Sequence, residues 1–262
     1  MTISFKDQLN RNIYLKGIPK RIVSLVPSQT ELLCDLGLES SIVGLTKFCV
    51  HPGHIKSKST IAGGTKQIHI DRVRALEPDI ILCNKEENTK EIVELCETIC
   101  PVHVSDIYTL SDSLELITQY GVIFNAVQKA LAICEEIKNE SESFKAFVAN
   151  KPELKAVYFI WKNPAMVAAN HTFINHLLQL NKFDNFYNDR SRYPEISLEV
   201  NNEAELVLLS SEPFPFKEKH KKELKDFYPN AKIILADGEM FSWFGSRLTK
   251  AFQYFKALRS SL

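Results

Sequence analysis

The sequence of 262 residues lacks both a charge imbalance and a long hydrophobic run. Lys plus Arg equals Asp plus Glu at 32 each, so we predict no nucleic-acid partner and a small-molecule ligand instead. No apolar run approaches the roughly 18 residues of a membrane helix. The first 21 residues contain no apolar signal region, cleavage site or lipid-carrying Cys. As it stands the sequence predicts a cytoplasmic protein, or a periplasmic one if a leader has been omitted.

Catalytic and nucleotide-binding motifs are also missing. Gly63 and Gly64 form a glycine pair without the GxGxxG spacing, and no GKS or GKT follows them. There is no GxSxG elbow, and none of the seven histidines belongs to an HExxH array. We therefore predict a protein that is not an enzyme and has no intrinsic cofactor.

The cysteines show no CxxC spacing. Most lie in apolar runs such as ELLCDLG and DIILCN, which is typical of reduced core thiols. No second ligand pair accompanies the two that are four residues apart, so the pattern does not predict a zinc site. The six are Cys34, Cys49, Cys83, Cys96, Cys100 and Cys134.

The alternative to a chelate-binding site is a site for a bare metal ion, with histidines of a loop as its ligands. His51 and His54 in FCVHPGHI are close enough to share an ion if the loop curls. Loop histidines are more often surface groups, and HxxH on a Pro/Gly loop fixes no ligand geometry. This alternative predicts stoichiometric metal that is lost on His51→Ala.

The composition, 45% hydrophobic and 24% charged, is that of a soluble globular protein with a sizeable core. Alternating residues before Pro19 predict an edge hairpin. Buried strands alternate with helices after it, which predicts a parallel sheet in an α/β lobe over residues 1–124. The predicted strands are 21–26, 41–46, 79–83 and 102–104, with helices from Pro27 to Gly37, before Pro78 and from about Asn88 to Cys100.

From 111 to 149 the apolar residues recur at helical spacing with no proline. A helix from 125 to 149 would be about 37 Å long, so we predict a connector over 125–150. The alternative is a covering helix of one larger domain. After Pro152 the alternation restarts, which predicts a second α/β lobe over 151–262, with a strand at 154–161, a short helix end before the strand in EAELVLL, and a closing helix from about Ser242.

Aromatic residues mark the expected ligand site, because open α/β sheets bind ligands beyond the carboxyl ends of their strands. Rigid aromatic walls suit a large, flat, partly apolar ligand. Some of these residues belong to the core instead if their strands end differently, and for Trp161 both interpretations stay open. Basic neighbours would meet negative charge on a chelate or be solvated. The residues are Trp161, Tyr193, Phe241, Trp243 and Phe244, with Lys66, Lys162 and Arg247 as the basic neighbours.

Four strings occur in the order of a known family: PKRIVSL, PSQTELL, IVGLT and ALEPDIIL. Together they resemble the first lobe of the class III periplasmic substrate-binding proteins of ABC transporters, which bind ferric siderophores, haem and cobalamin. The closest resemblance is to the cobalamin branch. YFIW, RYPEISLE and SWFGSRL extend it more weakly over the rest of the chain.

The resemblance implies two Rossmann-like α/β lobes joined by one rigid helix, and a monomer that holds a metal chelate in the cleft between the lobes. It favours a corrinoid, followed by a ferric siderophore or haem. It also implies that three residues of the first lobe, Ser28, Phe48 and Thr65, contact the ligand. Where the cobalamin branch carries further tryptophans, this chain has Thr65 and Asn84, so a less aromatic wall is expected. An intracellular sensor or enzyme that reuses the fold is the remaining alternative.

The resemblance further implies docking to an ABC permease. One acidic residue of each lobe meets permease arginines in this family, and Asp71 and Glu199 hold the corresponding positions by order. The alternative for both is a helix start, where a carboxylate favours the helix dipole.

Overall fold

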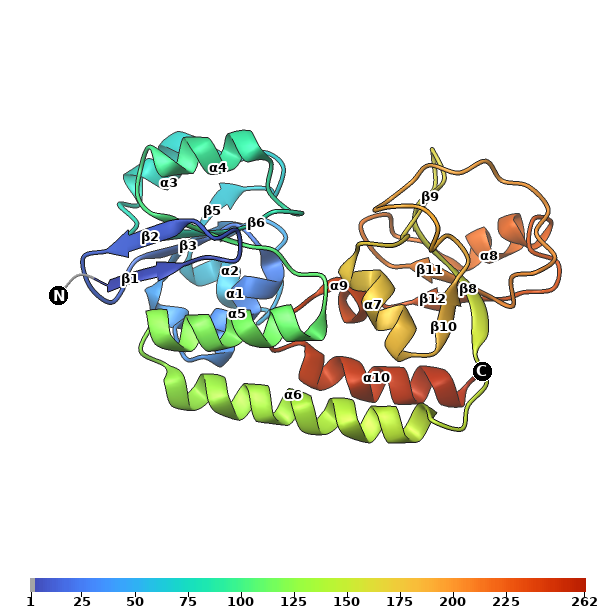
Figure 1. Cartoon of the computed structure of the whole chain (residues 1–262). Coiled ribbons are helices and arrows are strands. Elements are labelled where there is room, and N and C mark those ends of the chain that lie inside the picture. Colours follow the sequence, from blue (N-terminus) through green and yellow to red (C-terminus); the bar gives the residue numbers. More distant parts are fainter. Residues whose placement is uncertain (1–2) are drawn as a thin grey trace. The chain divides into compact units, whose positions relative to one another are not determined.

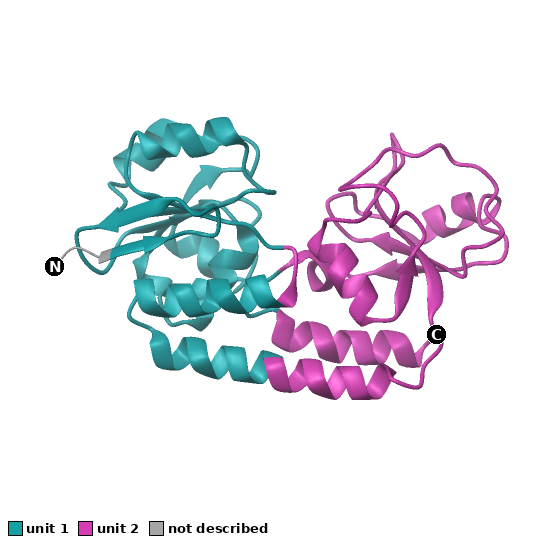
Figure 2. Cartoon of the chain, in the orientation of Figure 1, with its two compact units in different colours: residues 1–107, 111–137, 244–247 teal, residues 108–110, 138–243, 248–262 magenta. Residues whose placement is uncertain are grey.

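The computed structural model describes residues 3–262, which fold as an α/β protein of two compact units (Figures 1 and 2). Unit 1 holds residues 1–107, 111–137 and 244–247, and unit 2 holds residues 108–110, 138–243 and 248–262. Each unit contains its own parallel sheet. No helix among residues 3–262 is long and apolar enough to cross a membrane.

The sheet of unit 1 has the order β5-β4-β3-β6-β7, and all its neighbouring strands are parallel. Its central strands are buried on both faces, as the β-branched runs predict. The strands are β3 Ile22–Ser24, β4 Ile42–Thr46, β5 Thr60–Gly63, β6 Ile80–Asn84 and β7 Val102–Ser105.

Short helices connect these strands. Helix α1 has Pro27 at its first turn, and Gly37 beyond its end has φ 81°, so both helix limits follow from local sequence. The side chain of Thr89 accepts a hydrogen bond from the backbone N–H of Ile92 and caps α4. The helices are α1 Pro27–Asp35, the 3-10 helix η1 Glu39–Ser41, α2 Ile55–Lys58, α3 Ile70–Ala75, α4 Lys90–Glu97 and α5 Leu110–Ile123.

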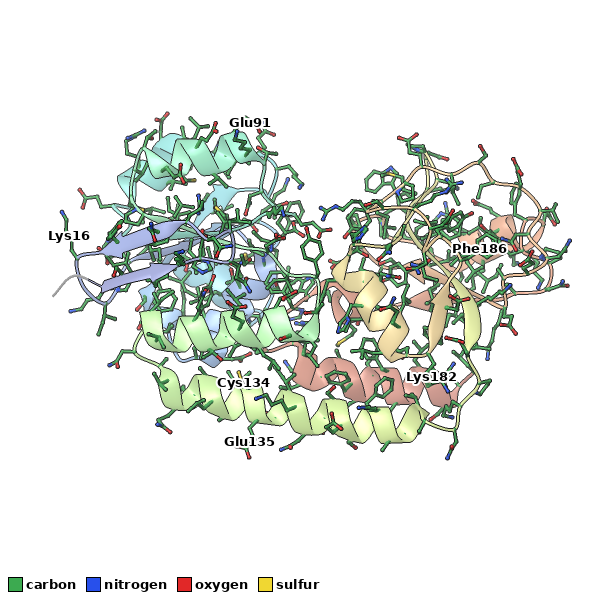
Figure 3. All side chains as sticks on the ribbon, viewed as in Figure 1. Lys16, Glu91, Cys134, Glu135, Lys182 and Phe186 are labelled. Atoms are coloured by element: carbon green, nitrogen blue, oxygen red, sulfur yellow. The ribbon has the colours of Figure 1, made fainter. Side chains whose placement is uncertain are left out.

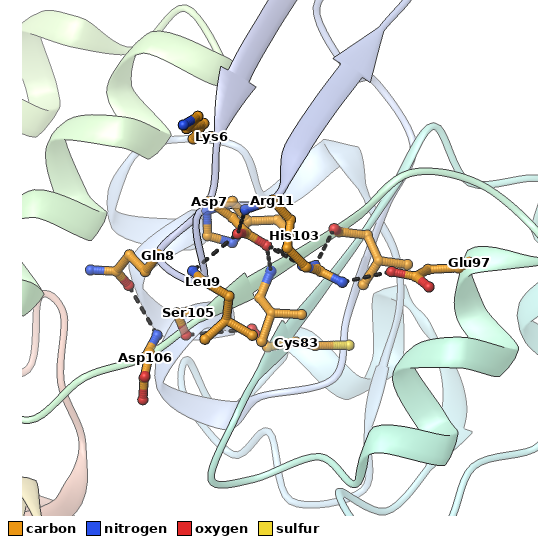
Figure 4. A network of polar contacts seen from close by, with 12 residues as sticks. Lys6, Asp7, Gln8, Leu9, Arg11, Cys83, Glu97, His103, Ser105 and Asp106 are labelled. Carbon is orange, nitrogen blue, oxygen red and sulfur yellow. Dashed lines mark hydrogen bonds and ion pairs between the residues drawn. The ribbon is translucent and has the colours of Figure 1, made fainter.

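The predicted hairpin is present as β1 Ile3–Lys6 and β2 Asn12–Leu15, an antiparallel sheet of its own. Figure 4 shows how its turn is attached to β7. The carboxylate of Asp7 accepts hydrogen bonds from the backbone N–H groups of Arg11 and Val104, and Arg11 donates to the carbonyl of Val102. This buried carboxylate therefore joins the hairpin to the main sheet.

The predicted helix of 125–149 is observed as α6, Val127–Val148. Asn125 has φ 53° and separates α6 from α5. Residues 127–137 belong to unit 1 and 138–148 to unit 2, so the chain passes from one unit to the other within this helix. After it, the Lys182 ammonium (Figure 3) donates to the carbonyls of Ala149 and Lys151. The boundaries 1–124, 125–150 and 151–262 stay a prediction.

The sheet of unit 2 has the parallel order β10-β8-β11-β12, and β9 is antiparallel to β8. One face carries an apolar cluster that includes Val157, Phe159, Val207 and Leu209. Strand β8 has the predicted limits. The strands are β8 Leu154–Trp161, β9 Met166–Val167, β10 Phe183–Asn185, β11 Leu206–Ser210 and β12 Lys232–Ala236.

Two predictions for the helices of unit 2 are wrong in detail. No helix precedes β11, because Asn201 instead accepts the N–H groups of Glu203 and Ala204 in a turn. The closing helix begins at Leu248, because Gly245, with φ 88°, interrupts the stretch after α9. The helices are α7 Phe173–Leu180, α8 Glu218–Lys225, α9 Gly238–Ser242 and α10 Leu248–Ser260.

All six cysteines have free thiols, as predicted; four are buried and two half-buried. Burial raises the pKa of Cys34 to about 12 and that of Cys100 to about 12. These thiols therefore stay protonated at neutral pH and act as core side chains.

Candidate functional site

The predicted ligand residues of unit 1 gather at one edge of its sheet. Ser28 follows β3, Phe48 follows β4, and Thr65 and Lys66 follow β5. Because these strands are parallel, their carboxyl ends share that edge. Ser28 is 5% exposed and Thr65 is 9% exposed, whereas Phe48 is 50% exposed. Phe48 thus presents the largest accessible apolar surface of the four.

Gly64 and Lys47 lie next to the ring of Phe48. A Cβ added to Gly64 would lie 3.2 Å from its Cε2 atom, so the glycine permits the ring to lie on the backbone. The Lys47 ammonium lies 5.0 Å from the ring centroid, within the range of a cation–π interaction. The loop after β4 therefore holds an aromatic face and a positive charge together.

Two asparagines brace this edge, and sequence reasoning missed the role of Asn88. Its side-chain amide donates to the carbonyls of Leu25 and Thr65, at 3.3 and 3.0 Å. Its Oδ1 accepts the N–H of Asn84 at 2.9 Å, and Asn84 in turn accepts the N–H of Glu86. The side chain of Asn84 is thus hydrogen-bonded to the backbone. Among the predicted ligand residues at this edge, Phe48 is the aromatic one. The only signal for this bracing was the polar stretch NKEEN directly after a buried strand.

Glu87 is a second residue at this edge that the sequence did not single out. Burial raises the pKa of its carboxyl above the ordinary value, while the nearby Lys66 ammonium acts in the opposite direction. Lys66 itself donates to the carbonyl of Glu86 and is exposed. Lys66 therefore presents its side chain at the surface, beside the loop that holds Phe48.

Arg247 does not face a ligand, which corrects the sequence-based interpretation. It is 4% exposed, and its Nε and a terminal nitrogen donate to the two carboxylate oxygens of Glu31 at 2.7 and 2.9 Å. Next to it in unit 1, Phe244 is only 6% exposed. Arg247 therefore fastens the segment 244–247 to α1, and neither side chain presents surface to solvent.

In unit 2, Trp161 ends β8 and is 38% exposed. Its indole N–H donates to the carbonyl of Asn163 at 3.0 Å, and its ring meets Phe214 edge-on at 5.7 Å. Lys162 pairs with Glu223 at 2.5 Å, and both side chains stay partly exposed. Trp161 and Lys162 line a cavity of about 140 Å³. The residues that line it are Phe159, Trp161, Lys162, Asn163, Ala165, Leu198, Phe216, His220, Glu223, Leu224 and Phe227.

Tyr193 lies in an irregular segment that is paired with the chain after β9. The N–H of Ala169 donates to the carbonyl of Arg192, and the N–H of Arg192 donates to the carbonyl of Asn170. The Arg192 guanidinium lies 5.8 Å from the ring centroid of Tyr193, which is half-buried. The sequence RSRY contained this signal, but only the aromatic residue was singled out. Tyr193 and Arg192 form a second aromatic and cationic pair.

Phe241 and Trp243 are the remaining predicted residues, and their burial corrects the expectation that they line a cleft. Phe241 is fully buried between Tyr158 and Phe255, at ring distances of 5.1 and 4.8 Å. Trp243 is 7% exposed, and its indole N–H donates to Glu212 at 2.9 Å. Their side chains hold α9 and the end of β11 together.

The loop histidines do not assemble a metal site. No group of three or more His, Cys, Asp or Glu side chains that could hold an ion occurs within residues 3–262. The imidazole of His54 lies 2.9 Å from the carboxylate of Glu39. His51 is partly buried in the preceding turn. The bare-metal alternative therefore has no geometric support in the part of the chain that the structure describes.

The two predicted docking acids are both exposed. Asp71 lies in the first turn of α3, where the helix-dipole explanation also applies. Glu199 lies in an irregular segment, so the alternative that it begins a helix is wrong.

Two α/β units, each with its own parallel sheet, carry aromatic side chains beside cations, after β4 in unit 1 and in the irregular segment around Tyr193 in unit 2. The family model described as "Periplasmic binding protein" matches residues 22–227. The chain belongs to this family.

Individual relatives agree with this. An ABC transporter substrate-binding lipoprotein, YvrC of Bacillus subtilis, is 26% identical over 206 residues, covering 76% of this chain but 65% of the relative's length. The vitamin B12-binding protein of Vibrio campbellii is 23% identical over 204 residues, 75% of this chain and 73% of that protein. Siderophore-binding protein BauB, solved with two acinetobactin molecules and ferric iron, has a TM-score of 0.79 at 17% identity and covers 99% of both chains.

Proposed function

We propose that this chain is a non-enzymatic substrate-binding protein that captures a metal chelate for an ABC-type uptake system, with a corrinoid favoured over a ferric siderophore or haem. The observation that carries the proposal is a set of aromatic side chains that are exposed or half-buried, two of which lie beside a cation. Phe48 with Lys47 provides it in unit 1, and Trp161 and the pair of Tyr193 and Arg192 provide it in unit 2.

The chemistry of this set suits a flat chelate. Aromatic side chains supply large contact areas and lose little conformational entropy on binding. Lys47, Lys66 and Arg192 add positive charge for carboxylates or for the negative charge of a ferric complex. The names of the B12-binding relatives support the corrinoid, and the siderophore-bound neighbour supports the second class.

We also propose that Asp71 and Glu199 dock the loaded protein on a permease. Each is an exposed carboxylate, and each lies in a different unit. Delivery to a permease requires an exported protein, which fractionation of cells that produce it from its native gene would test. Charge reversal, Asp71→Lys with Glu199→Lys, is expected to abolish uptake while the chelate's dissociation constant stays unchanged. A loss of chelate binding in this variant would contradict the docking role.

Intrinsic fluorescence tests the ligand site, because the chain has two tryptophans. Trp243→Phe leaves Trp161 as the reporter. Titration with cobalamin, cobinamide, haem and ferric siderophores is expected to quench Trp161 saturably with at least one of them. Phe48→Ala should weaken that ligand about tenfold, since a buried aromatic contact is worth on the order of 1 kcal/mol or more.

The matched control is Tyr14→Ala, which removes an aromatic side chain of unit 1 that is 63% exposed on the hairpin. It should leave the titration unchanged. Absence of saturable quenching with all four ligands, or equal weakening by both variants, would overturn the proposed function.

A further inference from the structure

Strand β12 is an open edge of the unit 2 sheet. Its backbone pairs with β11, and no other strand of residues 3–262 pairs with it. The N–H of Lys232 donates to Glu205, and the carbonyl of Ala236 accepts from Ser211. Because peptide groups of a parallel strand alternate in direction, those of Ile233 and Leu235 point away from β11. Four backbone hydrogen-bonding groups are thus presented along this edge.

The side chains beside this edge are apolar and accessible. Ile233 packs on the apolar cluster of the sheet but is only partly buried, and Leu235 is 37% exposed. A groove of about 560 Å³ runs between β12 and α8, lined by Lys221, Lys222, Lys225, Ala231, Lys232 and Ile233. Edge strands of monomeric proteins are usually blunted by charge, proline or a covering segment. Here the apolar residues Ala231 and Ile233 form the floor of the groove, and the four lysines form its walls.

The walls of the groove carry an excess of positive charge. The Lys225 ammonium donates to the carbonyls of Pro229 and Ala231, and the Lys232 ammonium donates to the carbonyl of Ser261. Neither contact neutralises the charge, since a carbonyl has none. Lys221 pairs with Glu218 at 2.9 Å.

The other acids of α8 and its end do not balance these lysines. Glu223 pairs with Lys162 on the other side of the helix, and Asp226 is the remaining carboxylate of the segment. The groove therefore combines outward-facing peptide groups, an apolar floor and uncompensated cations.

We propose that the groove between β12 and α8 docks an extended acidic peptide segment of a partner protein, which adds to the sheet beside β12. Strand addition satisfies the peptide groups of Ile233 and Leu235, and alternate side chains of the segment meet the apolar floor. Because alternate side chains of a strand share one face, the acidic side chains that meet the lysines lie on the same face of the segment as these apolar ones. A nucleic acid or an anionic lipid matches the charge but offers no backbone that continues a ladder of peptide hydrogen bonds, so the geometry favours a peptide.

A labelled hexapeptide with glutamate, valine and glutamate at alternate positions and serine between them is the probe, because one face then carries both acidic and apolar side chains and six residues span the length of the five-residue strand β12. Its binding to the full chain is followed by fluorescence anisotropy. Saturable binding is expected, and N-methylation of the peptide groups that face β12 should weaken it at least about tenfold, since each lost hydrogen bond is worth on the order of 1 kcal/mol.

Two protein variants complete the test. Lys222→Glu should weaken the hexapeptide about tenfold, whereas Lys219→Glu, which makes the same charge change on α8 outside the groove lining, should have little effect. Ile233→Pro removes one outward N–H and should therefore weaken binding by a similar factor. The variant is expected to fold, because proline is tolerated on edge strands. If this variant does not fold, the N-methylated peptide tests the same hydrogen bonds.

Absence of saturable binding would overturn the proposal. So would equal binding of the N-methylated peptide, or equal binding of a single-stranded oligonucleotide of the same charge, because either result would show a surface that recognises negative charge alone.

Discussion

At the scale of single residues, the buried ion pair of Arg247 and Glu31 has the largest expected effect on stability. Both side chains are 5% exposed, and the contact is bidentate. Arg247→Met would remove the guanidinium from the buried Glu31 carboxylate and should lower the free energy of unfolding by about 3–5 kcal/mol. Urea unfolding followed by circular dichroism measures this loss.

The control for that experiment is Lys162→Met. It breaks the ion pair with Glu223, in which the side chains are 32% and 45% exposed, so solvent screens it and the cost should stay below about 1 kcal/mol. Equal losses for the two variants would show that burial does not set the strength of the Arg247 pair.

His103 is expected to make stability depend on pH. It is fully buried, its Nε2 lies 2.9 Å from the Gln119 Oε1, and Asp7 and Arg11 lie nearby with opposed charges. Burial lowers the pKa of His103 below its ordinary 6.5. Its contribution to stability is therefore complete above pH 6.5 and is lost as the pH falls from 6.5 through the lowered folded-state pKa.

Melting temperatures measured between pH 5 and 8 test this dependence, with His103→Gln as the comparison. Glutamine cannot be protonated, so its curve should be flatter on the acid side. His220, whose pKa burial also lowers, is unchanged in both proteins and cancels in the difference. Parallel curves for the two proteins would refute the assignment to His103.

The sequence located aromatic residues near strand ends, but it did not distinguish the exposed ones from the buried ones. Phe48, which the family resemblance implied, and Trp161, for which both interpretations stayed open, stand at strand ends and are accessible. Phe241 looked equivalent, but it is covered by Tyr158, which lies 83 residues earlier in the chain. Partners that distant leave no local pattern, so sequence alone could not separate a core aromatic from a ligand-facing one.

At the scale of elements, Gly121 controls how closely α5 and α6 approach in unit 1. A Cβ at this position would lie 2.6 Å from the Cβ of Ala130. Replacing a helix-interior glycine by alanine ordinarily stabilises by up to about 1 kcal/mol. Here Gly121→Ala should instead destabilise by about 1–3 kcal/mol, because the helices must move apart.

Ala130→Gly in the same background should restore most of the lost stability, since it removes the clashing atom. Gly17→Ala is the matched control, because nothing lies within 4 Å of a Cβ there. Stabilisation by Gly121→Ala, measured by chemical denaturation, would contradict the close approach.

The elements that sequence predicted well are those whose patterns are local. The strand 154–161 has the predicted limits because a continuous apolar run fits a strand that is covered on both faces. The segment from 187 to 203 was not anticipated as a covering layer of irregular chain. Its order comes from hydrogen bonds to residues 167–170 and from packing of Ile196 and Leu198 on the apolar cluster, neither of which has a periodic signature.

At the scale of the whole molecule, the order of strands and helices was enough to predict an α/β protein with two parallel sheets, and the family match agrees with it. The site was only partly predictable. Aromatic residues at strand ends were recognisable, whereas Asn88 and Glu212 act through contacts that form only when the sheets are assembled.

The most direct test of the proposed function is calorimetric titration of the full chain with cobalamin, haem and a ferric siderophore, repeated with Phe48→Ala, Trp161→Ala and the double variant. We expect at least one chelate to bind with a micromolar or lower Kd. Each substitution should raise that Kd about tenfold and the double variant about a hundredfold, because the effects of independent contacts add. Failure of every chelate to bind, or binding that neither substitution weakens, would contradict the account.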